Sequence, residues 1–264
     1  MSKYISGVIL YDETIRQNAK DGTPLVKVIE TAGALPGIKV DKGTKPLPFC
    51  PGEVITEGLD GLRERLAEYR RLGAKFAKWR AVIDIGAGHP ELRRDHRPTR
   101  MRSRATPRSA RRSGIVPIVE PEVLMDGDHD VDRCYVDHRM GAQDRVRAAL
   151  LPEGRARRHG AQAQHGDRRA RRPKNRAGVE EVAEKTVKVL KACVPAAVPG
   201  IAFLSGGQSD EEATAHLDAM NQIGDLPWQL TFSYGRALQA APQKAWSGKA
   251  KTSPPRSAPS PTAP

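Results

Sequence analysis

Cysteine is scarce in this sequence, and nothing in its spacing suggests a disulfide framework or a zinc site. Cys50, Cys134 and Cys193 are odd in number and far apart, which argues against both classes. No run of about 18 apolar residues occurs, and the first residues lack a charged start followed by an apolar stretch. We therefore expect neither a membrane helix nor a secretory signal, and a reduced, cytoplasmic setting.

Aromatic residues are also few, at 5% of the chain, and the hydrophobic content is 38%. This is enough for a core only if the apolar residues are concentrated. A length of 264 residues suits one large α/β domain. We expect that domain over residues 1–248, interrupted at 91–112 and 138–176. The Pro/Ser-rich tail at 249–264 is predicted to be disordered.

Negative charge is scarce in two segments, which carry the whole of the chain's net charge of +13. Residues 91–112 hold nine Arg against two acids, and residues 138–176 hold eleven Arg and one Lys against three acids. The remainder is slightly acidic. Both segments lack Phe, Tyr and Trp and have no apolar period, so we expect them to contribute little to a core.

Three interpretations of these basic segments compete: an RNA-binding arm, a disordered linker, and translation out of the proper reading frame. The absent aromatics remove the stacking platforms on which single-stranded nucleic acids bind. Arg, Ala, Gly, Pro and His together are typical of GC-rich coding sequence read in a wrong frame. The frame-shift hypothesis is preferred, and a nucleic-acid partner is not expected.

Outside these segments, short apolar runs alternate with amphipathic stretches. The runs predict buried parallel strands at residues 6–10, 37–41, 76–82, 114–120, 200–205 and 229–234. Helices are predicted at 57–72 and 179–193 from their apolar stripes. A third is predicted from Ser209, because Glu212 completes a capping box there. This alternation is typical of an α/β fold with a parallel sheet.

Charged side chains recur on predicted strands, where burial without a partner is costly. Lys39 and Asp41 project to one side of their strand, and Lys78 and Arg80 share a face of theirs. A paired or ligand-binding role explains these residues better than a structural one. A surface-facing strand edge is the alternative for Lys78 and Arg80.

Further candidates lie at strand ends, where parallel α/β folds build their sites. Glu120 and Glu122 flank Pro121 and could act as general acid or base. The glycine-containing loops 205–209 and 233–236 follow the last two predicted strands and could bind phosphate. A plain turn is the alternative for either loop alone.

No metal site is predicted. The aspartates between 126 and 137 have the spacing of a calcium loop, but Val131 stands where that loop needs glycine. Four of the seven histidines lie in the basic segments.

Six segments together resemble class I fructose-bisphosphate aldolases, in that family's order. They are GIKVDKG (37–43), EGLDGLRERLAEY (57–69), FAKWR (76–80), GIVPIVEPEVLMDGDHD (114–130), GIAFLSGGQSDEEA (200–213) and LTFSYGRALQ (230–239). The resemblance implies a TIM (β/α)8 barrel, of which about six strands are recognisable here. It also implies a homotetramer that cleaves fructose 1,6-bisphosphate to two triose phosphates in glycolysis, through a Schiff base and without a metal or cofactor.

The resemblance also implies roles for individual residues. Lys78 and Glu120 would take part in iminium formation and proton transfer, and Glu122 would be an active-site polar residue. Residues that would bind substrate or its phosphates are Lys39, Arg80, Ser205, Gly206, Gly235 and Arg236.

Two departures from the family are expected to abolish activity. The first strand, which carries the cleavage aspartate, has no counterpart in this sequence. The Schiff-base lysine should lie 42 residues before Ser205 by the family's spacing, near Ala163, and its strand is not recognisable there. Lys174 and Asn175 follow an Arg/Pro run and lie too close to Ser205. A sugar-phosphate-binding protein without catalysis is the alternative function, ahead of an Arg-rich nucleic-acid binder.

Overall fold

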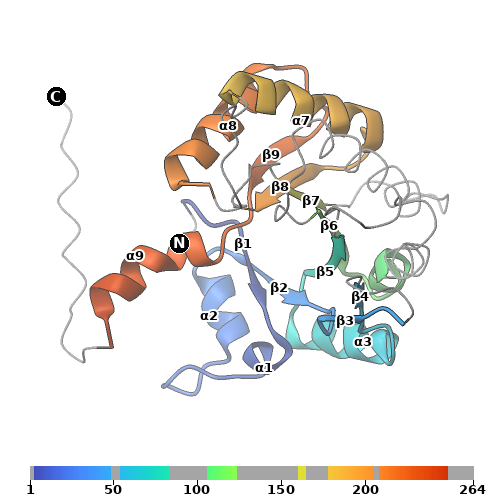
Figure 1. The fold of residues 1–264 in the computed structure, drawn as a ribbon. Helices are drawn as coiled ribbons and strands as arrows, with labels where there is room; N and C mark the ends of the chain where they lie inside the picture. Colours follow the sequence, from blue (N-terminus) through green and yellow to red (C-terminus); the bar gives the residue numbers. More distant parts are fainter. Residues whose placement is uncertain are drawn as a thin grey trace. The chain divides into compact units, whose positions relative to one another are not determined.

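The computed structural model describes residues 3–48, 54–83, 106–123, 160–164, 178–204 and 208–248 (Figure 1). Its strands are β1 (Gly7–Leu10), β2 (Leu35–Lys39), β3 (Thr44–Pro46), β4 (Val54–Thr56), β5 (Phe76–Ile83), β6 (Val116–Val123), β7 (Gly160–Gln164), β8 (Gly200–Leu204) and β9 (Gln229–Phe232). Its helices are α1 (Asp12–Ile15), α2 (Leu25–Thr31), α3 (Leu62–Leu72), α7 (Val179–Cys193), α8 (Asp210–Gln222) and α9 (Arg236–Trp246).

The chain divides into two compact units, residues 1–233 and 234–264. The first holds a seven-stranded sheet in the order β1-β2-β5-β6-β7-β8-β9, in which every neighbouring pair is parallel. A separate antiparallel hairpin joins β3 and β4. The second unit holds α9, whose Leu238 and Trp246 are exposed. The predicted α/β class is confirmed, because parallel strands alternate with helices along the chain.

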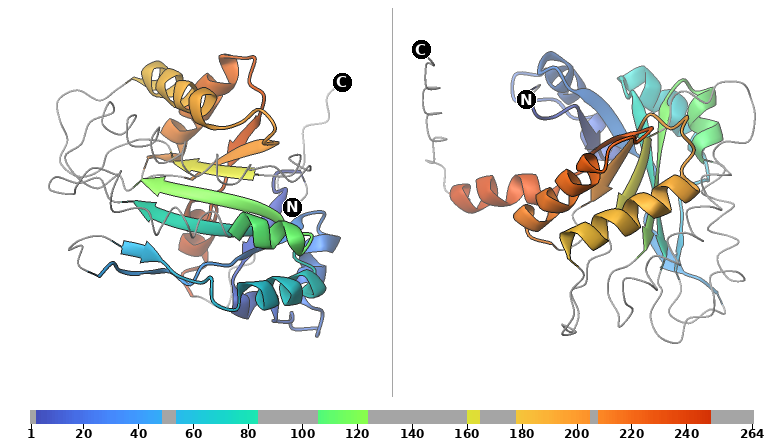
Figure 2. Two further views of the ribbon diagram at one scale, coloured as in Figure 1. Left: turned by 90° about the vertical axis from the view of Figure 1, so that its right-hand side faces the viewer. Right: turned by 90° about the horizontal axis from the view of Figure 1, so that it is seen from above.

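Two apolar clusters pack helices against one side of the sheet of the first unit (Figures 1 and 2). One joins α1, α2 and α3 to β1, β2 and β5, with Leu66, Tyr69 and Trp79 at most 1% exposed. The other joins α7 and α8 to β8 and β9 around Phe203 and Met220. Apolar residues at alternate strand positions therefore fill the helix-facing layer, and the intervening positions are left for polar side chains.

The basic segments contribute more to the fold than their composition predicted. Residues 106–112 form a helical turn, and Ala110 is fully buried in the first cluster. β7 lies inside the segment 138–176 and pairs with both β6 and β8. The prediction concerned the core, to which 91–112 adds the small Ala110. Strand pairing uses backbone groups, which every non-proline residue supplies, so β7 can join the sheet without an apolar pattern.

Helix α3 begins five residues later than the apolar stripe predicted. Gly58 and Gly61 have φ of 122° and 61°, and this left-handed backbone ends the preceding loop immediately before Leu62. Leu72 and Val179, predicted on the buried stripes, are 36% and 37% exposed, because each lies at a helix end.

An ion-pair cluster that the sequence did not predict joins α1 to α3. The Arg16 guanidinium donates hydrogen bonds to Glu68 and Asp12, and the hydrogen bonds to Glu68 and Asp12 raise the pKa of Arg16. Burial opposes the shift at Asp12, but hydrogen bonds from Arg16 and Tyr69 lower its pKa overall. The pKa of Glu68 is lowered by its hydrogen bonds from Arg16. Burial raises the pKa of Tyr69.

Candidate active site

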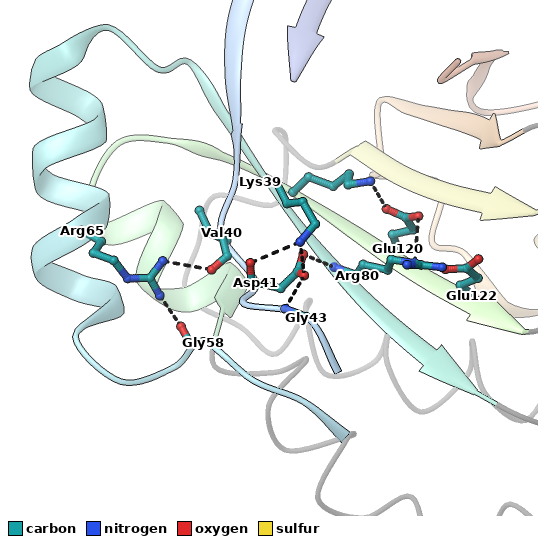
Figure 3. Close-up of polar contacts among 10 residues, drawn as sticks. Lys39, Val40, Asp41, Gly43, Gly58, Arg65, Arg80, Glu120 and Glu122 are labelled. Carbon is teal, nitrogen blue, oxygen red and sulfur yellow. Dashed lines mark hydrogen bonds and ion pairs between the residues drawn. The ribbon is translucent and has the colours of Figure 1, made fainter. Parts of the chain in front are cut away.

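Three adjacent strands carry most of the predicted site residues. Lys39 is the last residue of β2 and pairs in register with Lys78 of β5. Arg80 pairs in register with Glu120 of β6. Because residues in register on parallel strands face the same side, these charges converge on one face, at the carboxyl end of β2 and in the middle of β5 and β6 (Figure 3). The structure thus brings together five of the predicted residues, with Glu122 as the fifth.

Two carboxylates of β6 neutralise the cations of β5. Glu120 Oε2 lies 2.5 Å from Lys78 Nζ, and Glu120 Oε1 lies 4.0 Å from Arg80 Nε. Arg80 Nε also contacts Glu122 Oε2. Glu120 Oε2 is close enough to Lys78 Nζ to form an ion pair, but it accepts no hydrogen bond. The Glu120 side chain is 2% exposed and that of Arg80 41%, so Arg80 is the open end of the cluster.

Asp41, which the sequence placed on the same side of its strand as Lys39, is also a member of this cluster. Lys39 Nζ lies 2.5 Å from Asp41 Oδ1, which also accepts a hydrogen bond from the Gly43 amide at 3.2 Å. Asp41 Oδ2 accepts one from the Arg80 amide at 3.2 Å. The two-residue spacing from Lys39 was the only signal in the sequence. It predicted a shared side, but it could not reveal a contact to a backbone amide 39 residues away.

Helix α3 fixes the loops around this cluster. The Arg65 guanidinium donates to the Val40 carbonyl at 3.0 Å and to the Gly58 carbonyl (Figure 3). At Gly58, with φ of 122°, an added Cβ would lie 2.9 Å from the Lys42 amide nitrogen. The segment after β2 and the segment before α3 are therefore locked together beside Asp41.

The structure describes only part of the two loops predicted to bind phosphate, 205–209 and 233–236. Ser205 and Gly206 lie outside the described residues. The capping box that follows them is confirmed, with Ser209 and Glu212 exchanging hydrogen bonds at 3.1 Å. Gln208 Nε2 lies 3.0 Å from His216 Nδ1, and both residues are buried. Gly235 and Arg236 stand at the beginning of α9 in the second unit. Phosphate binding by these four residues stays a prediction.

Strand β7 occupies the place where the family spacing expects the Schiff-base lysine, yet its sequence, GAQAQ, contains none. Ala163 pairs with Phe203, which packs in the helix-facing cluster. Gln162 pairs with Ala202 and follows Ala161, the partner of Val119. The prediction that this strand was lost is wrong, because pairing of β7 with β6 and β8 needs no particular side chain. The absence of a lysine from it stands.

A family model described as class I fructose-bisphosphate aldolase matches residues 1–257. The chain belongs to the class I fructose-bisphosphate aldolase family. A probable class 1 aldolase of Xanthomonas campestris is 50% identical over 94% of this chain and 73% of that protein. The cytoplasmic isozyme of spinach, Spinacia oleracea, is 45% identical over 93% of this chain and 68% of that protein.

A solved aldolase structure from Plasmodium falciparum, in complex with TRAP and a small-molecule inhibitor, shares the fold of this chain. Its TM-score is 0.88 at 38% identity, and it covers 94% of this chain and 72% of the Plasmodium chain. Aldolases have the TIM-barrel fold, so the fold predicted from the sequence motifs is confirmed.

Neither a membrane-spanning helix nor a cluster of metal ligands is found in the part of the chain that the structure describes. No helix there is both long and apolar enough to cross a membrane. No three His, Cys, Asp or Glu side chains gather there in a way that could hold a metal ion. The calcium-like segment at 126–137 lies outside the described residues.

Proposed function

We propose that this chain binds fructose 1,6-bisphosphate or its triose-phosphate halves on the β2–β5–β6 face, and that it does not cleave them. The supporting observation is the charged cluster, in which Lys39, Lys78 and Arg80 stand on neighbouring strands. Each of these cations is paired with a carboxylate, but their N–H groups can still donate charge-assisted hydrogen bonds to phosphate or hydroxyl oxygens of a ligand. The Arg80 side chain is 41% exposed, so an incoming ligand would contact it first.

In the family reaction, a lysine amine attacks the substrate ketone, and loss of the carbonyl oxygen as water gives an iminium. The iminium withdraws electrons as the carbon–carbon bond breaks. Lys78 and Glu120 would move protons during iminium formation, since their charged groups are already in contact. Glu122 would orient Arg80, with which it pairs. Ser205 and Gly206 in one loop could bind a phosphate through backbone amides, and Gly235 and Arg236 in the other could do so through an amide and the guanidinium.

The proposed loss of catalysis rests on β7. A class I aldolase cannot form its covalent intermediate without the lysine, and β7 supplies only Gly, Ala and Gln. Lys39 and Lys78 are poor substitutes because each ammonium is engaged by a carboxylate within 2.5 Å. Removing the nucleophile removes the step that divides one high barrier into two lower ones.

The test pairs a binding measurement with a trapping measurement on the full chain. Calorimetry with dihydroxyacetone phosphate should detect binding, and Arg80→Met should weaken it about tenfold, the effect of one charged hydrogen bond. Lys27→Met is the matched control, since Lys27 is an exposed surface lysine paired with Glu30. Borohydride reduction followed by mass spectrometry should find no lysine adduct. An adduct on any lysine, together with cleavage of fructose 1,6-bisphosphate, would refute the proposed inactivity.

A cytoplasmic location is part of the same proposal. It is supported by relatives such as the spinach protein, which is named a cytoplasmic isozyme. Fractionation of the source cells, followed by detection of the chain, would test it.

A further inference from the structure

The Lys39 ammonium is held from several sides at the carboxyl end of β2. Asp41 contributes a carboxylate oxygen at 2.5 Å and its backbone carbonyl oxygen at 3.3 Å. The Tyr11 ring lies on another side, with its centroid 5.7 Å from Nζ. The Lys39 side chain remains 19% exposed and Tyr11 64% exposed. The Lys39 ammonium is therefore partly accessible to a ligand, while its contacts with Asp41 fix its position.

The Asp41 carboxylate is fully occupied by these internal contacts. Its side chain is only 2% exposed, one oxygen serves Lys39 and the Gly43 amide, and the other serves the Arg80 amide. Such a carboxylate has no surface left for a ligand. Its contacts instead connect the Lys39 side chain to the backbone of β5 at Arg80.

We propose that Asp41 is a positioning residue that sets the distance and direction of the Lys39 ammonium relative to Arg80, so that both cations meet the same anionic ligand. The proposal rests on the proposed function, because it assumes a sugar phosphate at this face. It adds a residue that acts through Lys39 without touching the ligand. Gly43, with φ of 85°, assists by turning its amide back to Asp41.

A double-mutant cycle separates this role from simple support of the fold. Asp41→Asn preserves the shape and can still pair with one backbone amide, but its neutral side chain no longer attracts the ammonium. In the otherwise unchanged chain it should weaken binding of dihydroxyacetone phosphate about tenfold. In a Lys39→Met background it should weaken binding by less than about twofold, because the group through which it acts is gone. Equal losses in both backgrounds would overturn the proposal.

Two further measurements keep the test decisive. Trace acetylation read by mass spectrometry needs no ligand: Asp41→Asn should raise labelling of Lys39 several-fold and leave Lys78 unchanged as the internal control. Unchanged Lys39 labelling overturns the positioning role. Absence of dihydroxyacetone phosphate binding by the unsubstituted chain overturns only the proposed function. If Asp41→Asn lacks a cooperative thermal transition, Asp41→Glu keeps the charge, displaces its oxygens by one methylene, and must show the same dependence on Lys39.

Discussion

Neutralising Glu120 should destabilise the fold, because it leaves a lysine charge in the sheet interior without its partner. Glu120 is 1% exposed, and the Lys78 side chain that it contacts at 2.5 Å is 13% exposed. Breaking one half of a buried pair costs about 3–5 kcal/mol. Arg80 keeps Glu122, so only Lys78 loses its main partner. We expect Glu120→Gln to lower the free energy of unfolding by about 3 kcal/mol, at the lower end of that range.

Urea denaturation at neutral pH, followed by circular dichroism, measures this loss. Lys78→Met removes the other half of the pair, and the double variant Lys78→Met/Glu120→Gln should regain about 2 kcal/mol relative to the sum of the single losses. Glu122→Gln is the comparison, because its partner Arg80 is 41% exposed and water can solvate the guanidinium. The Glu122→Gln variant should lose about 1 kcal/mol of unfolding free energy. Additive single losses, or a Glu120→Gln loss below about 1 kcal/mol, would refute the buried-pair reasoning.

Four other outcomes are expected. Gly37→Ala should cost about 1–3 kcal/mol of unfolding free energy by thermal melt, because its Cβ would lie 2.3 Å from the Phe76 ring; Gly178→Ala, with nothing within 4 Å, should be nearly neutral. Ser209→Ala should cost about 1 kcal/mol in the same assay by removing the capping box. The pKa values of Asp12 and Glu68 are lowered in the folded chain, so these carboxylates stabilise the fold at pH values above their ordinary pKa values of 3.8 and 4.5, and the stabilisation is lost as the pH falls through the lower folded values. Arg16→Met should therefore reduce the drop in the urea midpoint between pH 6 and acid pH. An unchanged drop would contradict this role of Arg16. A lysine restored to β7, at Gln162 or at Ala163, should give a borohydride-trapped dihydroxyacetone phosphate adduct that the unsubstituted chain does not give, because β7 itself contains no lysine.

The predictable parts of the fold were those with strong periodicity. The stripe at 179–193 gave α7 with both ends correct, and the Ser209–Glu212 spacing gave the start of α8. Both signals are local, since a helix buries residues three and four apart and a capping box spans three residues. The predicted start of α3 was wrong because Gly58 and Gly61 interrupt the helix where the apolar stripe continues.

The charged cluster was predictable in membership but not in pairing. Alternation along each strand placed Lys78 and Arg80 on one face of their strand, and Lys39 and Asp41 on one face of theirs. Which carboxylate meets which cation depends on the register between strands, such as Arg80 with Glu120, and no local pattern encodes that register. The β3–β4 hairpin and the Arg16 contacts with α3 were missed for a related reason, since each joins separate parts of the chain.

Strand β7 shows that a place in the sheet and the chemistry done from that place are specified separately. Its backbone pairs with β6 and β8 over GAQAQ, and such pairing makes almost no demand on side chains. An apolar pattern is needed only where a strand must contribute to a core. A segment of small and amide residues can thus fill the place between β6 and β8 while supplying no nucleophile. For the same reason β7 has no apolar run that would mark it in the sequence, although the family spacing from Ser205 points to Ala163 within it. Retention of the charged face on β2, β5 and β6 is consequently no sign that the covalent step survives, since that step depends on the identity of one side chain on a different strand.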